Sequence, residues 1–293
     1  MGQNHGGAYL IDLVKQAVFQ KVAYDSEDIE WFGEEGGRGL RGIAFEGETI
    51  YISTSNSLLA YDQRFKLIES WRNPYLANCQ GICVYQRKLF LACAENDCIL
   101  SFDLDDKKFH WALQVQSERF QFRPLIFDPL GSDGPLFINK LQLRTVHSDD
   151  TGLYFSGLKT GGLLRFNGEV IHMHVELPNG AQDAQQFRNG VIFNDSRAGV
   201  LRYAGDDDGA EDRALPISFF TESDHAPDDP DETRMLKRGY GRGLCILSAT
   251  VVAGGSTPAG VSLYNIRENK GLMTVRFTKN VREAVNCIQV WPE

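Results

Sequence analysis

The sequence lacks the features that mark several protein classes. No apolar run approaches the roughly 20 residues that a transmembrane helix needs. Residues 1–7 contain neither a basic region nor an apolar stretch, so we expect no secretory signal and place the protein in the cytoplasm. The six cysteines are too few for a disulfide scaffold in a chain of 293 residues, and none forms a CxxC pair. We therefore expect all six to be reduced.

An excess of positive charge is also missing. Lysine and arginine total 30 against 39 aspartates and glutamates, which gives a formal net charge of −9. Nucleic acids and anionic membrane surfaces are bound by clustered basic residues, so we expect neither partner. A hydrophobic content of 42% and a charged content of 24% are typical of a globular protein. The length allows one large all-β domain or two smaller domains.

What the sequence does contain is a repeat of turn residues followed by a short alternating strand. One copy reads SNSLLAYD at residues 55–62. The other copies lie at residues 6–13, 96–103, 160–167, 196–203 and 258–265. Most copies follow a second element, an apolar strand, a polar turn and another apolar strand, as at residues 40–45 and 49–53. Units of four strands at roughly 40-residue spacing are typical of β-propellers.

The repeat predicts one all-β domain over residues 1–293, a six-bladed β-propeller with four-stranded antiparallel blades. The sixth unit is split between the two ends of the chain. Its first strand is predicted at residues 285–291, and the others at residues 8–13 and 17–24. We expect the C-terminal strand to pair with the N-terminal strands and close the ring, which leaves no open sheet edge.

Two intervals between units are longer than the rest. Residues 114–139 are rich in phenylalanine and proline, and residues 205–240 are acidic. Long insertions in compact domains commonly form lids or disordered loops. We expect both to be loops over one face of the propeller.

Polar residues recur where the first strand of each unit begins, and in a propeller this strand lines the central channel. Two arginines in this set indicate an anionic ligand, because guanidinium groups match carboxylate and phosphate. Asp183 is the single carboxylate, which makes it the candidate general base or metal ligand. Aligned on their apolar cores, the strands present Arg41, Gln80, Gln142, Asp183, Gly243 and Asn286, with Arg242 and Arg38 adjacent.

Two other interpretations of this ring stay open. The channel can be polar and water-filled with no ligand, and Asp183 can serve only as an ionic partner of an arginine. His172 and His174 share one face of a strand, as metal ligands do. Their segment aligns with the outermost strand of a unit, so we expect surface histidines that bind no metal. The sequence shows no catalytic triad context, nucleophile elbow or phosphate loop.

The repeat resembles the six-bladed propellers of the gluconolactonase and strictosidine-synthase-like superfamily. The segments GGSTPA at residues 254–259 and AVNCIQVWP at residues 284–292 resemble a group of poorly characterised bacterial propeller proteins more closely. The superfamily resemblance implies a divalent cation in the channel, with Asp183, Asn286 and Gln80 as oxygen donors. Arg41 stands where such a cation needs a carboxylate, so we favour a channel without the cation. The bacterial group implies histidines near the ring, where this chain has Gln80 and Asn286.

Two functions follow as expectations. The first is an enzyme of hydrolase, lyase or isomerase type that acts on a polar, anionic metabolite in the central channel. The second is a non-catalytic propeller that binds a small ligand or a protein partner. The fold alone does not choose between them, because propellers host many unrelated functions.

Overall fold

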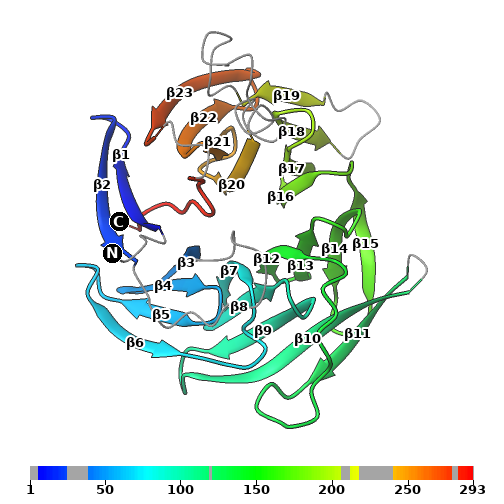
Figure 1. The fold of residues 1–293 in the computed structure, drawn as a ribbon. Coiled ribbons are helices and arrows are strands. Elements are labelled where there is room, and N and C mark those ends of the chain that lie inside the picture. The colour runs from blue at the N-terminus through cyan, green and yellow to red at the C-terminus, as the bar shows by residue number, and fades with distance from the viewer. Residues whose placement is uncertain are drawn as a thin grey trace, which may run out of the picture. The chain divides into compact units, whose positions relative to one another are not determined.

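The computed structural model describes residues 6–24, 39–118, 121–205, 212–217, 240–278 and 283–292, and its regular elements are β-strands (Figure 1). The described residues include no helix long and apolar enough to cross a bilayer. The chain divides into two compact units, which are described separately. Unit 1 comprises Met1–Leu10 and Phe19–Glu176, and unit 2 comprises Ile11–Val18 and Leu177–Glu293. The expected single domain stays a prediction.

Unit 1 contains three antiparallel sheets, each with its strands in chain order (Figure 1). Blade 1 consists of β3 (Leu40–Glu46), β4 (Thr49–Thr54), β5 (Leu58–Tyr61) and β6 (Leu67–Trp71). Blade 2 consists of β7 (Cys79–Tyr85), β8 (Lys88–Cys93), β9 (Cys98–Asp103), β10 (Lys108–Glu118) and a fifth strand, β11 (Gln121–Phe127). Blade 3 consists of β12 (Leu143–Asp149), β13 (Gly152–Gly157), β14 (Gly162–Phe166) and β15 (Ile171–Glu176). The first strands of these blades are neighbours, with β7 between β3 and β12.

Unit 2 contains two sheets of the same kind, and their first strands are also neighbours. Blade 4 consists of β16 (Ala181–Phe187), β17 (Gly190–Asp195), β18 (Val200–Gly205) and β19 (Arg213–Pro216). Blade 5 consists of β20 (Tyr240–Ile246), β21 (Val251–Thr257), β22 (Gly260–Asn265) and β23 (Lys270–Arg276). Repeated four-stranded antiparallel blades that pack first strand beside first strand make the chain an all-β propeller.

The predicted count of six blades is wrong, because the described residues form five complete blades. The N-terminal strands β1 (Gly7–Asp12) and β2 (Ala17–Ala23) exist as expected, but they form a sheet of two strands only. Residues 283–292, which include the predicted closing strand, carry no strand. Val285 instead donates its backbone N–H to Ser256 O at 3.1 Å and packs in the apolar cluster of blade 5. The predicted closure of the ring is therefore not seen in the described residues.

The first long insertion is only partly the loop that was expected, since residues 128–139 carry no strand but the residues before them do. Its first residues extend β10, and β11 pairs along that extension from Ala112↔Phe127 to Glu118↔Gln121. Pro124 is tolerated because β11 is the last strand of its sheet, where a missing N–H need not break a ladder. Most of the second insertion lies outside the described residues, but its Arg213–Pro216 forms β19.

An aspartate or asparagine lies at the end of the third strand, or directly after it, in blades 1, 2, 3 and 5 and caps the next turn. In blade 1, Asp62 Oδ1 accepts the backbone N–H groups of Arg64 and Lys66 at 2.9 and 2.8 Å. This is the Asx turn, which these two residue types favour. Asp12 forms the same turn between β1 and β2. The N-terminal pair thus has the local structure of the outer half of a blade. The other caps are Asp103, Asn167 and Asn265.

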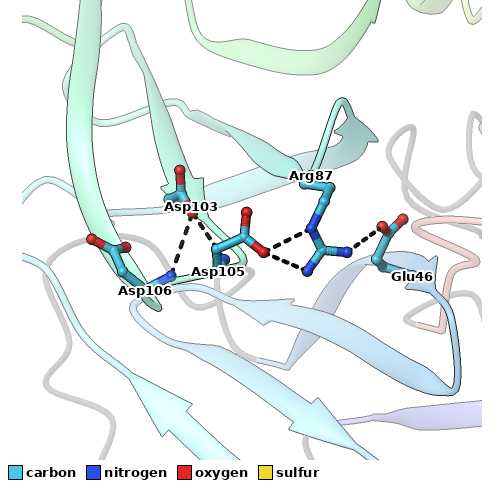
Figure 2. A network of polar contacts seen from close by, with 5 residues as sticks. All are labelled: Glu46, Arg87, Asp103, Asp105 and Asp106. Carbon is cyan, nitrogen blue, oxygen red and sulfur yellow. Dashed lines mark hydrogen bonds and ion pairs between the residues drawn. The ribbon is translucent and has the colours of Figure 1, made fainter.

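A polar network joins blades 1 and 2 on the surface of unit 1 (Figure 2). Arg87 Nε donates to Asp105 Oδ1 at 2.8 Å. Arg87 Nη1 donates to Glu46 Oε1 at 3.3 Å. Asp103 holds the backbone N–H groups of Asp105 and Asp106, which presents the Asp105 carboxylate to the arginine. All these side chains reach solvent, so their ion pairs contribute little to stability.

Candidate functional site

A β-bulge interrupts the first strand of every blade near the point where the strand begins. In blade 1, Arg41 and Gly42 together oppose the single residue Ser53 on β4. The same shift occurs at the start of β7, β12, β16 and β20. A bulge re-aims the side chain at its first residue, and bulges are enriched beside active sites. The first bulged residues of blades 1 to 5 are Arg41, Gln80, Arg144, Asp183 and Arg242.

In blades 1 and 2 the residue after the first bulged residue is a glycine, because atoms of the neighbouring first strand approach closely. A Cβ built at Gly42 would lie 2.3 Å from Cγ2 of Ile82, and one at Gly81 would lie 2.4 Å from the carbonyl oxygen of Arg144. No side chain fits such distances without movement of the neighbour. The first strands of blades 1, 2 and 3 therefore pack tightly at their bulges.

The sequence alignment selected Gln142 for blade 3, and the ladders show instead that Arg144 has the equivalent position. Gln142 precedes β12 with a φ of 55°. The reason for the slip is Leu141, which is 3% exposed and packs in the core although it lies before the strand. An alignment on apolar residues therefore began the strand two positions too early.

Arg41 is 7% exposed in unit 1, and its charge acts on the thiol of Cys79. A hydrogen bond with Cys93, together with burial, raises the pKa of Cys79 well above its ordinary value, although Arg41 and Ser53 oppose the shift. The thiol therefore stays protonated and leaves the charge of Arg41 intact. The partly exposed Gln80 donates its amide N–H to the side chain of Asn78.

A buried carboxylate that the sequence did not indicate fixes the approach to Arg144. Asp97, 1% exposed, accepts the backbone N–H groups of Lys140, Leu141 and Gln142 at 2.6, 2.8 and 2.8 Å. Burial raises the pKa of Asp97, and these three hydrogen bonds oppose that shift. The turn between β8 and β9 is thereby tied to the start of blade 3.

Asp183 has a comparable role in unit 2, with an additional strained backbone. Its φ is 55°, which is uncommon for a residue other than glycine. Its Oδ2 accepts the backbone N–H of Gly243 at 2.8 Å and the side chain of Asn194 at 3.0 Å. In the described residues Asp183 forms no ion pair with an arginine. The interpretation of Asp183 as an ionic partner of an arginine therefore finds no support there.

Tyr240 and Arg242 lie beside one another at the start of β20. The guanidinium carbon of Arg242 lies 5.5 Å from the centroid of the Tyr240 ring, a cation–π contact. Gln182, 2% exposed, donates to Ser196 Oγ at 2.8 Å and to the Tyr240 hydroxyl. Nε of Arg242 and Oδ1 of Asn194 are both buried, and neither atom has a hydrogen-bond partner among the described residues. Sequence reasoning missed Gln182 and Tyr240.

The remaining predicted residues are placed as follows. The backbone of Asn286 passes next to Gly243, where a built Cβ would lie 3.4 Å from the Asn286 carbonyl carbon. Gly243 has a φ of 73°, which suits a glycine. Arg38 lies outside the described residues. Because the predicted site draws residues from both units, its convergence on one axis stays a prediction.

The histidines occupy blade 3. His172 and His174 lie on β15, the fourth strand, which confirms the outer-strand assignment. His147 on β12 stacks on Tyr154 with ring centroids 5.1 Å apart. Burial lowers the pKa of His147 to about 4. The described residues hold no group of three or more histidines, cysteines or acids able to bind a metal ion. All six cysteines are free, as expected.

These contacts define what the unit 2 residues, Asp183, Arg242, Tyr240 and Gln182, can do chemically. Asp183 is fixed through one oxygen, so the other can accept a proton. Arg242 can hold an anion, and Tyr240, whose oxygen accepts from Gln182, can donate its own proton to a ligand. This set offers a base, a proton donor and a fixed positive charge.

Comparisons with known proteins identify no family. No family model and no curated protein matches the chain. Solved structures that match number 1031 chains, so the architecture is widespread. One is from a nidogen/laminin complex, with 14% identity, a TM-score of 0.50, and coverage of 82% of this chain and 81% of that chain. This likeness concerns the fold alone.

Two further solved structures match with TM-scores below 0.5. The computationally designed protein Ika8 is 8% identical with a TM-score of 0.48, and the match covers 87% of this chain and 92% of that chain. Streptogramin B lyase is 11% identical with a TM-score of 0.45, and the match covers 79% of this chain and 70% of that chain.

Proposed function

We propose that the protein is a small-molecule enzyme of hydrolase, lyase or isomerase type, which acts on a polar, anionic metabolite at the bulged ends of its first strands. The observation that carries this proposal is Asp183. It combines a backbone in the left-handed region with a carboxylate held by Gly243 and Asn194. Strained residues that the surrounding structure holds in place are concentrated at active sites.

The proposed mechanism assigns one role to each side chain. Asp183 accepts a proton from the substrate or from a water molecule, through the oxygen that makes no hydrogen bond in the described residues. Arg242 binds the anionic group, and the Tyr240 ring restricts where the guanidinium can lie. Tyr240 returns a proton to the leaving or rearranging group. Gln182 donates a hydrogen bond to the Tyr240 oxygen, which leaves the hydroxyl hydrogen for the ligand. The resemblance to the gluconolactonase-like superfamily supports hydrolysis of a cyclic ester as the first chemistry to test.

A second candidate is a non-catalytic propeller that binds a small ligand or a protein partner. The observation that favours it is Asp97, whose carboxylate also holds backbone N–H groups across a blade boundary. If Asp183 is only a clamp of this kind, the site binds without turning over its ligand.

The experiment is a turnover and binding screen with lactones, phosphate esters and carboxylates, followed by the Asp183→Asn variant. Asparagine tolerates a positive φ and keeps an oxygen for Gly243, so the fold is retained while the base is lost. The proposal predicts that turnover falls by 10²-fold or more while binding is kept, on the order of general-base catalysis. Asp212→Asn, at an exposed position of unit 2, is the matched control and should retain full turnover. Binding by the native protein without any turnover would favour the second candidate.

A further inference from the structure

A strap formed by residues 283–292 crosses the start of blade 5 without forming a strand (red in Figure 1). Val285 donates its backbone N–H to Ser256 O at 3.1 Å, and a Cβ built at Gly255 would lie 2.7 Å from the Val285 side chain. Val285 and Ile288 pack in the apolar cluster of the blade. The strap thus packs on the blade without joining its ladder, and lifting it breaks no strand pairing.

The strap touches the proposed site at Gly243. A Cβ built at Gly243 would lie 3.4 Å from backbone atoms of Asn286 and Cys287, so the two backbones are in contact. Gly243 also donates its N–H to Asp183 Oδ2 at 2.8 Å, and its carbonyl oxygen accepts from Asn194 Nδ2 at 3.4 Å. Gly243 thus joins the strap to the carboxylate of the candidate base.

The conformation of Gly243 depends on these neighbours. Its φ is 73°, and glycine adopts this and many other backbone conformations with little difference in energy. The residue itself therefore does not hold its N–H toward Asp183. Contacts with the strap and with Asn194 restrict it, and loss of the strap contact gives the Gly243 N–H other directions to adopt.

Cys245 lies under the strap and reports whether the strap is docked. It is 7% exposed, it packs with Val285 and Ile288, and the backbone of Val290 hydrogen-bonds to its thiol. Burial raises the pKa of Cys245, so the docked strap protects this thiol from reagents. The Val290 side chain, by contrast, is 52% exposed and does not belong to the apolar cluster.

We propose that docking of the strap regulates the unit 2 site. The docked strap holds Gly243 against Asp183 and keeps the carboxylate in the position that the proposed function needs. A lifted strap releases Gly243 and leaves Asp183 without that hydrogen bond, so the site is switched off. The role as a switch rests on the proposed function, whereas the contact between strap and site does not. Because coupling is reciprocal, an anion bound beside Asp183 stabilises the docked strap by the same factor.

The test compares the native full chain with Val285→Asn, which places a polar side chain in the apolar cluster. Strap opening is measured by the rate at which Cys245 reacts with a thiol reagent, and the site by hydrogen exchange at the Gly243 amide, which needs no ligand. We expect both rates to rise about tenfold or more, the factor for losing the burial of one valine side chain. Val290→Asn, at an exposed position of the same strap, is the matched control and should leave both rates unchanged. Exchange at Ile192, in the core of blade 4, should keep its native rate, which separates strap opening from loosening of the whole unit.

Inorganic phosphate tests the reciprocal effect. Phosphate bound to the native chain should slow the labelling of Cys245, and Val285→Asn should bind phosphate more weakly by the same factor. Arg242→Gln should abolish the effect of phosphate on labelling, because the guanidinium is the group that binds the anion.

The inference is wrong if Val285→Asn leaves Gly243 exchange at the native rate, whether or not Cys245 labelling rises. It is also wrong if phosphate binds the native chain and Cys245 is labelled as fast as before. Faster Gly243 exchange without phosphate binding or turnover would sustain the coupling and overturn the proposed function, so the two failures are distinguishable. Should Val285→Asn fail to fold, Ile288→Asn, at a partly buried position of the same cluster, takes its place.

Discussion

Replacement of Asp97 by alanine should destabilise unit 1 more than any other single change at a carboxylate described above. The substitution removes the acceptor for three backbone N–H groups, which then lie in a largely buried place with no partner from this side chain. Hydrogen bonds to charged groups contribute about 1.5–3 kcal/mol each. Part of this sum is offset, because burial of the carboxylate is itself unfavourable and raises the pKa of Asp97. We expect a net loss of roughly 3–4 kcal/mol for Asp97→Ala.

Asp97→Asn should lose less, roughly 2 kcal/mol, because one amide oxygen can still accept the N–H groups of Lys140 and Leu141. In the native chain those two groups share Oδ2, while Gln142 uses Oδ1. The assay is urea unfolding followed by tryptophan fluorescence, with hydrogen exchange at residues 140–142 as the local readout. Glu169→Ala, at an exposed turn of unit 1, is the control and should change stability by less than about 0.5 kcal/mol. Asp97→Ala within about 0.5 kcal/mol of the native chain would refute the assignment of a clamp.

Three further predictions concern other parts of the chain. Burial lowers the pKa of His147 to about 4 from its ordinary 6.5, so the unfolded chain binds the proton first as the pH falls. The free energy of unfolding should therefore decrease between about pH 6.5 and pH 4, by up to about 3 kcal/mol. His147→Phe, which keeps a ring against Tyr154, should remove this slope in guanidinium melts at pH 7 and 4.5; an unchanged slope would contradict it. Gly81→Ala should destabilise unit 1 by about 2 kcal/mol or more, because the added Cβ would meet the carbonyl oxygen of Arg144. An unaltered urea midpoint would argue against the close approach of β12 to β7 at this residue. Cys79 is fully buried with a raised pKa and should react with a thiol reagent only on unfolding, so prompt labelling of the native chain would be inconsistent with its burial.

Much of the fold was predictable because a blade is specified locally. Alternating strands and an Asx turn after the third strand lie within about 40 residues, and four of the five blades follow the predicted spacing of four strands. The fifth strand of blade 2 was not predicted, since the segment around Pro124 is typical of a loop and becomes a strand only beside the extended β10. The sixth blade failed for a similar reason, because the apolar residues of 285–291 fit a strand equally well whether or not a partner pairs with them.

The first-bulge positions were predictable in part, and the candidate site that their residues are expected to form stays a prediction. The alignment selected Arg41, Gln80 and Asp183, and the ladders give each of them the first bulged position. In blade 5 the alignment selected Gly243, and the adjacent Arg242 has that position. Blade 3 differs because Leu141 is a core residue outside the strand, which moved the choice from Arg144 to Gln142. The Asp97 clamp has no sequence signature, since its partners lie 43 to 45 residues away. Contacts of this kind depend on tertiary packing and not on local pattern.

The central claim is that the first-bulge residues bind anions, and anomalous diffraction from crystals soaked in selenate tests it most directly. Selenate carries the charge and shape of a phosphate group, and its selenium locates each bound anion without assumption. The account predicts a peak within about 4 Å of the guanidinium of Arg242, the reach of an ion pair. Well-occupied selenate peaks elsewhere on the protein, with none beside a first-bulge arginine, would contradict the account.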